Sequence, residues 1–428
     1  MYRQLEKRIK NKSAQIAVIG LGYVGLPLAV ELSKRGFEVT GIDTDTDRVN
    51  NVKNSIPYIL DVEIKDIKKL VERDSLRPTT DFRKLSSADV IIICVPTPLK
   101  RKYQPNISYI KQAVKQIKLR LRAGQLVILE STTYPGTTNE IILPMLESTG
   151  LKCGQDFFLV FSPERIDPGN EKFPLNKIPK VVGGVGEESA KLFKMLYENI
   201  IEKVVVVSSP RAAECVKLLE NTFRLINIGL VNELAMMCHK MNLDVWEIID
   251  AAKTKPFGFM PFYPGPGVGG HCIPKDPLYL YWKAKLYGFK SRFIKLAADL
   301  NSAMPAYVVS RLNALRPLTE TKVLVLGVTY KKDVKDLRKS PGLEIIELLK
   351  KQKADVLYAD PLIPYLKFAH FNLKATPITE EILKNMDCAL LVTDHTGFDY
   401  DFILQHSKAI FDTRNVYKGV KNSKIIRL

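Results

Sequence analysis

The sequence predicts an α/β protein with two Rossmann-like doubly wound domains, joined by a central helical segment with one long helix. Short, uninterrupted apolar strands alternate with helical patterns over residues 1–207, and the same alternation restarts after Pro317. Such strands are typical of a parallel sheet that helices cover on both faces. A long helical pattern lies between the two regions. We therefore expect domains at residues 1–207, 208–316 and 317–428.

The first domain opens with a strand, a helix and a second strand, at residues 16–19, 24–35 and 37–43. Their spacing suits a βαβ unit, which takes about 30 residues. Further strands are expected at residues 90–95, 126–130, 157–161 and 204–207, and a further helix at 108–121.

The middle of the chain is predicted to be helical. A pattern that is apolar on most sides runs from Pro210 to about Met241, and Asp244 with Glu247 forms a capping box for the next helix. A helix that is apolar nearly all round must be covered by other helices or by a second subunit. A homodimer is therefore expected. In the last domain we expect strands at 322–326, 355–358, 388–392 and 409–411, and a helix at 342–351.

The composition, 46% hydrophobic and 26% charged, is ordinary for a globular protein. A net charge of +18 first suggests a nucleic-acid partner. The basic residues are spread along the chain, however, and no nucleic-acid motif is present. We expect no nucleic-acid partner and attribute part of the charge to a phosphate-bearing small molecule. A steep salt dependence of DNA or RNA affinity would favour the alternative.

Cysteine and histidine usage predicts reduced thiols and no metal site. The six cysteines lie far apart without paired spacing, and the five histidines are equally scattered. The basic N-terminus and the apolar run at residues 16–32 imitate a signal peptide, but glycines and a proline interrupt the run and no cleavage site follows. No other segment reaches membrane-spanning length without charge. We expect a cytoplasmic protein with no membrane partner.

Residues 20–25 read Gly-Leu-Gly-Tyr-Val-Gly, a G-x-G-x-x-G between the first strand and its helix. These glycines permit a tight turn and close approach to a pyrophosphate, which the helix N-terminus attracts. Asp43, at the end of the second strand, would bind the adenosine ribose and repel a 2′-phosphate, which predicts NAD as the cofactor rather than NADP. A glycine turn in another kind of α/β protein is the alternative, because a motif match is only a hypothesis.

Residues 264–276 read Pro-Gly-Pro-Gly-Val-Gly-Gly-His-Cys-Ile-Pro-Lys-Asp. The glycines let the backbone approach a ligand, and Asp276 with Pro277 predicts a helix N-cap followed by proline at the first helical position. Helix N-termini and nearby lysines favour the thiolate form of a cysteine, so Cys272 is a candidate nucleophile beside Lys275. The alternative is a tight loop with a buried structural cysteine.

Two further loops leave the carboxyl ends of predicted strands, Cys-Val-Pro-Thr-Pro at 94–98 and Glu-Ser-Thr-Thr-Tyr-Pro-Gly at 130–136. Ligands of open α/β sheets bind at this edge. By position alone, their hydroxyls either serve a cofactor or cap turns.

Together with Phe-Ser-Pro-Glu-Arg at 161–165, Glu-x-x-Lys-x-x-x-Asn at 214–221 and the segment 327–341, these motifs resemble the nucleotide-sugar 6-dehydrogenase family. The resemblance extends from residue 16 to about 417. The family includes UDP-glucose, GDP-mannose and UDP-N-acetylhexosamine dehydrogenases. It implies NAD as cofactor, a UDP-sugar as substrate, and a four-electron oxidation of a sugar CH₂OH to a carboxylate through a cysteine-bound thiohemiacetal and thioester.

The resemblance also implies roles for individual residues. Cys272 would be the nucleophile, Lys217 and Asn221 would stabilise the oxyanion, Asp276 would position water or act as base, Glu164 would act near the thioester, and Thr132 would lie near the reacting carbon. Cofactor contacts would come from Gly20, Gly22, Tyr23, Val24, Gly25, Asp43, Arg48, Thr97, Thr132 and Arg338. Substrate contacts would come from Glu164, Arg165, Lys217, Asn221, Gly267, Gly269, Lys331 and Arg414.

Each role has a plainer alternative. Lys217 is otherwise a solvated helix charge, Asp276 an N-cap and Glu164 an exposed loop residue. Arg338 is otherwise a partner in a salt bridge near a helix.

The chain departs from the UDP-glucose branch at two positions. Pro168 stands where that branch has a second glutamate, and His271 where it has a small serine. Both features resemble the UDP-N-acetylhexosamine branch, and we expect UDP-N-acetylglucosamine as the substrate. UDP-N-acetylmannosamine and UDP-glucose are alternatives, as is an NAD-binding regulatory protein without turnover.

Overall fold

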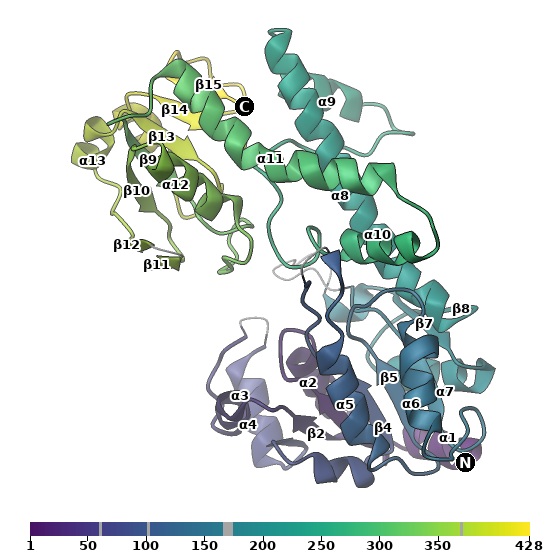
Figure 1. The fold of residues 1–428 in the computed structure, drawn as a ribbon. Coiled ribbons are helices and arrows are strands. Elements are labelled where there is room, and N and C mark those ends of the chain that lie inside the picture. The colour runs from purple at the N-terminus through teal and green to yellow at the C-terminus, as the bar shows by residue number, and fades with distance from the viewer. Residues whose placement is uncertain (60–61, 101–102, 166–173, 369–370) are drawn as a thin grey trace. The chain divides into compact units, whose positions relative to one another are not determined.

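The chain forms two compact units in a computed structural model that describes residues 1–59, 62–100, 103–165, 174–368 and 371–428 (Figure 1). Unit 1 comprises residues 1–220 and 282–288, and unit 2 comprises residues 221–281 and 289–428. The boundary falls inside the long central helix α8 (Pro210–Lys240). This architecture confirms the predicted α/β class and the long helix, while the exact limits of three domains remain a prediction.

Unit 1 is built on an eight-stranded sheet with the order β3-β2-β1-β4-β5-β6-β7-β8. The strands are β1 (Gln15–Ile19), β2 (Glu38–Ile42), β3 (Leu76–Thr79), β4 (Val90–Ile93), β5 (Leu126–Leu129), β6 (Phe158–Phe161), β7 (Lys180–Gly184) and β8 (Val204–Val207). The chain reverses its direction of winding between β1 and β4, and open α/β sheets bind ligands at the carboxyl ends of strands beside such a switch point.

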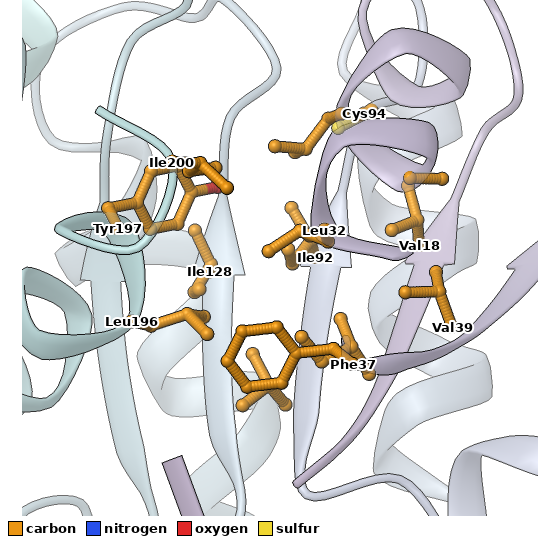
Figure 2. Close-up of a cluster of buried hydrophobic side chains, with 14 of the residues drawn as sticks. Val18, Leu32, Phe37, Val39, Ile92, Cys94, Ile128, Leu196, Tyr197 and Ile200 are labelled. Carbon is orange, nitrogen blue, oxygen red and sulfur yellow. The ribbon is translucent and has the colours of Figure 1, made fainter. Parts of the chain in front are cut away.

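The helices of unit 1 alternate with these strands. They are α1 (Tyr2–Lys10), α2 (Gly25–Lys34), α3 (Thr46–Lys53), α4 (Ile64–Glu72), η1 (Phe82–Ser86), α5 (Ser108–Lys118), η3 (Thr138–Ile142), α6 (Leu143–Glu147), η4 (Leu175–Lys177) and α7 (Glu187–Tyr197). Strands β4, β5 and β6 bury all their residues, as expected for strands covered on both faces. Figure 2 shows part of this core, where Val18 and Ile92 of the sheet lie near Leu32 of α2.

The prediction of a parallel sheet is wrong at one pairing, so the last two strands, β7 and β8, run opposite to the other six. β6 and β7 pair antiparallel, whereas β7 and β8 pair in parallel. β7 is not among the strands expected from the sequence, because its first residue is a lysine and its last two are glycines. α1 and β3 are not among the expected elements either, because their apolar residues are too few to give a clear pattern.

Unit 2 contains a five-stranded parallel sheet with the order β10-β9-β13-β14-β15. Its strands are β9 (Lys322–Leu326), β10 (Asp355–Ala359), β13 (Cys388–Leu391), β14 (Ile410–Asp412) and β15 (Ile425–Arg427). Helices α12 (Pro341–Lys351), α13 (Glu380–Asn385) and α14 (Tyr400–His406) accompany the sheet, and β11 (Tyr365–Phe368) pairs antiparallel with β12 (Phe371–Lys374). The second predicted α/β region is thus confirmed.

The helices that follow β8 and precede β9 along the chain are α8, α9 (Val245–Lys253), α10 (Asp276–Leu286) and α11 (Arg292–Leu315). Asp244 caps α9 as predicted, accepting hydrogen bonds from the backbone of Trp246 and Glu247. Two buried amides join α8 to α11: Asn232 Nδ2 donates to Asn301 Oδ1 at 2.8 Å. Asn232 Oδ1 also accepts from the backbone N–H of Gly265 at 3.0 Å, so this pair anchors the start of the Cys272 loop.

Candidate active site

The glycine fingerprint forms a tight turn between β1 and α2. Gly20 has φ +98°, and a Cβ at Gly25 would lie 1.8 Å from the carbonyl oxygen of Gly20. A Cβ at Gly22 would meet nothing within 4 Å. Gly20 is required because the turn needs a positive φ there, and Gly25 because the turn is closely packed. At Gly22 the lack of a side chain leaves the backbone accessible to a ligand.

Asp43 lies at the carboxyl end of β2, beside this turn. Its Oδ2 accepts a hydrogen bond from the backbone N–H of Leu21 at 2.8 Å, and Arg48 Nη1 lies 3.4 Å from the same oxygen. The carboxylate therefore supports the turn in addition to its predicted contact with the ribose. Tyr58, which sequence analysis missed, donates to the carbonyl of Leu21 at 2.7 Å.

The turn and its surroundings fit NAD. The helix α2 begins at Gly25, and its N-cap residue Val24 makes no side-chain cap hydrogen bond. An anion such as a pyrophosphate is the natural partner for such a helix N-terminus. The Tyr23 side chain of the same turn is 53% exposed. Accessible backbone at Gly22, the helix N-terminus and the Asp43 carboxylate together match a dinucleotide.

The loop after β5 carries Thr132 and is held by a carboxylate from α8. Glu214 accepts hydrogen bonds from the backbone N–H groups of Gly136 at 2.5 Å and Thr138 at 2.9 Å, and from the Thr138 hydroxyl at 2.7 Å. Burial raises the pKa of Glu214 to about 7, and these hydrogen bonds oppose the shift. Thr132 is half-buried, and Thr97 in the loop after β4 is buried.

Glu164 and Lys217 are brought together in unit 1. Lys217 Nζ donates to the backbone carbonyl of Glu164 at 2.5 Å, and Lys217 is buried. Lys217 is therefore not the solvated helix charge of the plainer alternative. Lys180 Nζ lies 2.9 Å from Glu164 Oε2, and the adjacent Arg165 forms an ion pair with Glu220 at 2.6 Å. Pro168 lies outside the described residues.

In unit 2, the Cys272 loop runs directly into α10. The backbone carbonyl of Cys272 accepts hydrogen bonds from the N–H groups of Lys275 at 3.1 Å and Asp276 at 2.8 Å. The helix begins at Asp276, so the predicted N-cap is wrong by one position. The Cys272 side chain is exposed, which contradicts the alternative of a buried structural cysteine.

Asn221 and Asp276 form a buried pair close to this loop. Asn221 Nδ2 donates to Asp276 Oδ2 at 2.6 Å, and Arg224 donates to the amide oxygen of Asn221. An arginine can only donate, and an ionised aspartate can only accept. The two neighbours therefore fix which way the Asn221 amide faces. Arg224, which lies one helical turn after Asn221, is not among the site residues expected from the sequence.

His271 stands beside the nucleophile candidate and contacts Lys275. The ammonium of Lys275 lies 3.2 Å from Nδ1 and 3.3 Å from Nε2 of the ring. Burial and the charge of Lys275 lower the pKa of His271 to about 4. His271 is therefore neutral near pH 7, and the position next to Cys272 carries no imidazolium charge.

The glycines of the Cys272 loop permit close packing on the segment that follows β9. A Cβ at Gly269 would lie 2.5 Å from Tyr330 Cβ, and the N–H of Gly270 donates to the carbonyl of Arg338 at 2.8 Å. Gly267 has φ +134°, where side chains are rarely tolerated. This packing brings the loop together with the predicted contact residue Arg338.

The remaining predicted residues of unit 2 are held by local contacts. Arg338 forms an ion pair with Asp336 at 2.6 Å, which is the salt bridge of the plainer alternative. Arg414 Nε donates to the carbonyl of Val392 at 2.8 Å, and burial lowers the pKa of Arg414. A Cβ at Gly265 would lie 2.7 Å from Arg414 Nη1, and Lys331 is half-buried.

Within the ranges that the structure describes, no helix is long and apolar enough to span a membrane. The same ranges contain no group of three or more His, Cys, Asp or Glu side chains arranged to hold a metal ion.

Comparison with known proteins matches three family models along the chain. They are the NAD-binding domain of the UDP-glucose/GDP-mannose dehydrogenase family at residues 14–201, its central domain at 211–303 and its UDP-binding domain at 324–419.

Similar proteins cover nearly the whole chain. A UDP-N-acetyl-D-mannosamine dehydrogenase of Pyrococcus horikoshii is 35% identical over 94% of this chain and 96% of its own length. A UDP-N-acetyl-D-glucosamine 6-dehydrogenase of Pseudomonas aeruginosa is 38% identical over 90% of this chain and 92% of its own. A solved UDP-D-ManNAc dehydrogenase structure from P. horikoshii superposes with a TM-score of 0.87 at 33% identity, covering 96% of this chain and 98% of that one. The chain therefore belongs to the UDP-glucose/GDP-mannose dehydrogenase family and is an NAD-dependent nucleotide-sugar dehydrogenase.

Proposed function

We propose that the chain oxidises C6 of a UDP-N-acetylhexosamine to the uronic acid, with UDP-N-acetylmannosamine as its substrate. The observation that carries the reaction class is the exposed Cys272 in the loop just before α10, close in sequence to the buried Asp276 that pairs with Asn221. The choice of sugar rests on relatives, because several similar proteins that cover at least nine-tenths of this chain are UDP-N-acetyl-D-mannosamine dehydrogenases. This departs from the gluco-configured substrate that the sequence alone suggested.

UDP-N-acetylglucosamine is the second candidate. The P. aeruginosa relative that carries this activity in its name is 38% identical, slightly more than the mannosamine relatives. The epimers differ at C2, whereas the proposed oxidation takes place at C6. The machinery for the oxidation is therefore the same in either case.

In the proposed reaction, loss of a proton from O6 and a hydride from C6 gives an aldehyde. The Cys272 thiolate adds to the aldehyde carbon, and loss of a second hydride from the resulting thiohemiacetal gives a thioester. Water attacks the thioester carbonyl, the C–S bond breaks, and the carboxylate and the thiol are released. When bound, NAD⁺ supplies the hydride acceptor for both oxidations, and the turn at Gly20, Gly22 and Gly25 would hold it with Asp43.

We assign the polar residues by what their atoms can do. The Lys217 ammonium and the second N–H of the Asn221 amide are donors suited to an oxyanion. The Asp276 carboxylate, whose Oδ2 already accepts from Asn221, is suited to orient water or accept its proton. We assign Glu164 to the thioester step and Thr132 to the reacting carbon. Substrate phosphates and base would be bound by Lys331 and Arg414.

A panel of UDP-sugars tests this proposal. Purified protein with NAD⁺ should form NADH most efficiently with UDP-N-acetylmannosamine, and should form two NADH per uronic acid. The same assay with UDP-N-acetylglucosamine, UDP-N-acetylgalactosamine and UDP-glucose ranks the alternatives by kcat/KM. A clear preference for the gluco epimer would overturn the mannosamine assignment, and one NADH per sugar would overturn the acid as product.

A further inference from the structure

A buried ionic cluster lies at the carboxyl edge of the sheet of unit 1, behind Glu164. Its members are Glu130 after β5, Glu164 after β6, Lys180 at the start of β7 and Tyr197 at the end of α7. Lys180, Glu130 and Tyr197 are each at most 3% exposed. None of these three residues is among the site residues expected from the sequence.

The direction of β7 is what brings Lys180 to this edge. Because β7 runs antiparallel to β6, with Phe161 opposite Gly183, its first residue lies beyond the carboxyl end of β6. In an all-parallel sheet the start of this strand would lie at the opposite edge. The antiparallel pairing of β7 with β6 therefore places Lys180 at the edge of the sheet where ligands bind.

Lys180 joins an inner carboxylate to an outer one. Its Nζ lies 3.1 Å from Glu130 Oε2 and 2.9 Å from Glu164 Oε2. The side chain of Glu130 is 0% exposed and that of Glu164 is 13% exposed. The Tyr197 hydroxyl donates to the other oxygen of Glu130, and Lys180 Nζ lies 5.5 Å from the centroid of the Tyr197 ring. Glu130 is thus held in the core by hydrogen bonds from both Lys180 and Tyr197.

The charges of the cluster support a fixed geometry. Burial alone would lower the pKa of Lys180, but the two carboxylates outweigh it and raise the pKa, so the ammonium stays charged. Burial raises the pKa of Glu130. Removing one partner from such a cluster leaves an uncompensated buried charge, which is strongly destabilising. The cluster therefore has one favourable arrangement rather than several.

Glu164 is consequently held at two points by two lysines. Lys180 fixes its carboxylate, and Lys217 donates to its backbone carbonyl. Its second carboxylate oxygen, Oε1, accepts from the N–H of Arg165 at 2.6 Å. A carboxylate so constrained can present only one orientation to a ligand at the edge of the sheet.

We propose that Lys180 is a positioning residue that, anchored by Glu130 and Tyr197, orients the Glu164 carboxylate for hydrolysis of the thioester. This rests on the proposed function, in which Glu164 acts at that step. In the hydrolysis, water adds its oxygen to the thioester carbon, its proton passes to Glu164, and the C–S bond breaks to return the Cys272 thiol. Lys180 touches neither the sugar nor water in this scheme.

The test uses Lys180→Met in the full-length protein, assayed with the sugar that the wild-type protein oxidises best. Because hydrolysis follows both oxidations, the variant should still form two NADH per active site in a fast burst. Steady-state kcat should then fall about 100-fold, within the range for loss of an acid–base contribution. Mass spectrometry should find the acylated peptide that carries Cys272.

Two further variants serve as controls. Lys180→Arg should regain much of the lost kcat. Lys34→Met removes an ion pair with Asp66 elsewhere in unit 1, and its kcat should match that of the wild-type protein.

Tyr197→Phe covers the case in which Lys180→Met fails to fold. It removes only the hydroxyl that anchors Glu130, and should lower kcat about tenfold with the burst retained, because the cluster loosens without losing its charges. Unchanged kcat, or loss of the burst together with the steady-state rate in a folded variant, would overturn the positioning role. Failure of the wild-type protein to oxidise any UDP-sugar would instead overturn the proposed function, since that result does not involve Lys180.

Discussion

At the level of single residues, Cys272 differs from the other cysteines in its surroundings. It is the exposed one among six, whereas Cys94, Cys238 and Cys388 are buried. Burial raises the pKa of Cys388 to about 12 and that of the half-buried Cys153 to about 12 as well. These thiols stay protonated near neutral pH, so they are poor nucleophiles.

We predict that Cys272→Ser keeps the fold and NAD binding but loses nearly all acid formation, because a serine hydroxyl without a base is a poor nucleophile. NADH formation and mass spectrometry of the product measure this. Cys153→Ser is the matched control, since Cys153 precedes β6 at the amino edge of the sheet, and it should retain full activity. Unimpaired turnover in Cys272→Ala would exclude the thioester mechanism.

Asp43 is predicted to make the protein prefer NAD⁺ strongly over NADP⁺, through repulsion of the 2′-phosphate. The structure shows that its Oδ2 also supports the backbone of Leu21, so Asp43→Ala would disturb the turn as well as the charge. Asp43→Asn removes the charge and keeps an acceptor. It should narrow the ratio of kcat/KM between the two cofactors. Equal efficiency of the wild-type protein with both would contradict the prediction.

Glu214 should make stability depend on pH. Its pKa is about 7 in the folded protein against an ordinary value of 4.5 for a glutamate side chain. Between these values the native state binds more protons than the unfolded chain, so the contribution of Glu214 to the free energy of unfolding falls as pH rises from about 4.5 to 7. Wild type should therefore lose more stability between pH 5 and pH 8 than Glu214→Gln does, as measured by urea midpoints. An equal loss in both proteins would refute this.

At the level of elements, two glycines of the fingerprint turn are expected to differ in role. Gly25 is needed for the fold of the turn, whereas Gly22 is needed for binding of the cofactor. Gly25→Ala would place a Cβ 1.8 Å from the Gly20 oxygen, so the turn must distort and both stability and NAD affinity should fall. Gly22→Ala meets nothing within 4 Å, so stability should be unchanged. Its NAD affinity should still fall if the pyrophosphate contacts this backbone. Calorimetry measures the NAD affinity of each variant, and thermal unfolding measures its stability. Unchanged NAD affinity in Gly22→Ala would argue against contact between the pyrophosphate and this backbone.

At the level of the whole molecule, helix α8 leaves apolar side chains uncovered. Phe223, Leu230 and Met237 recur every seven residues and are 46%, 59% and 53% exposed. This spacing keeps them on one side of a helix. We propose that a second copy of the chain covers them, in line with the homodimer expected from the sequence.

Leu230→Glu should shift the protein toward a monomer, because a buried carboxylate would be costly in such an interface. Light scattering at micromolar concentration measures the mass. The control His239→Gln alters an exposed position on the opposite side of the same helix and should leave the mass unchanged. A wild-type protein that is a stable monomer would contradict the proposal.

The sequence by itself determined the features that local patterns encode. Apolar runs predicted most strands, the glycine fingerprint with Asp43 predicted the cofactor, and the order of the motifs predicted the family. The Asp244 cap and the long helix from Pro210 were also predictable, because both depend on residues within a few turns of each other.

Only the tertiary structure decided the contacts between residues far apart in the chain. Glu214 holds a loop 78 residues away at Gly136, and Asn221 meets Asp276 55 residues away. Lys180 is buried because Glu130 and Glu164 compensate its charge, and it reaches them because β7 is reversed. A lysine at the start of a short strand gives no local signal of burial, since the compensating charges come from other strands. The physical reason is that the free energy of a buried charge depends on its partners in space, which a local sequence pattern does not contain.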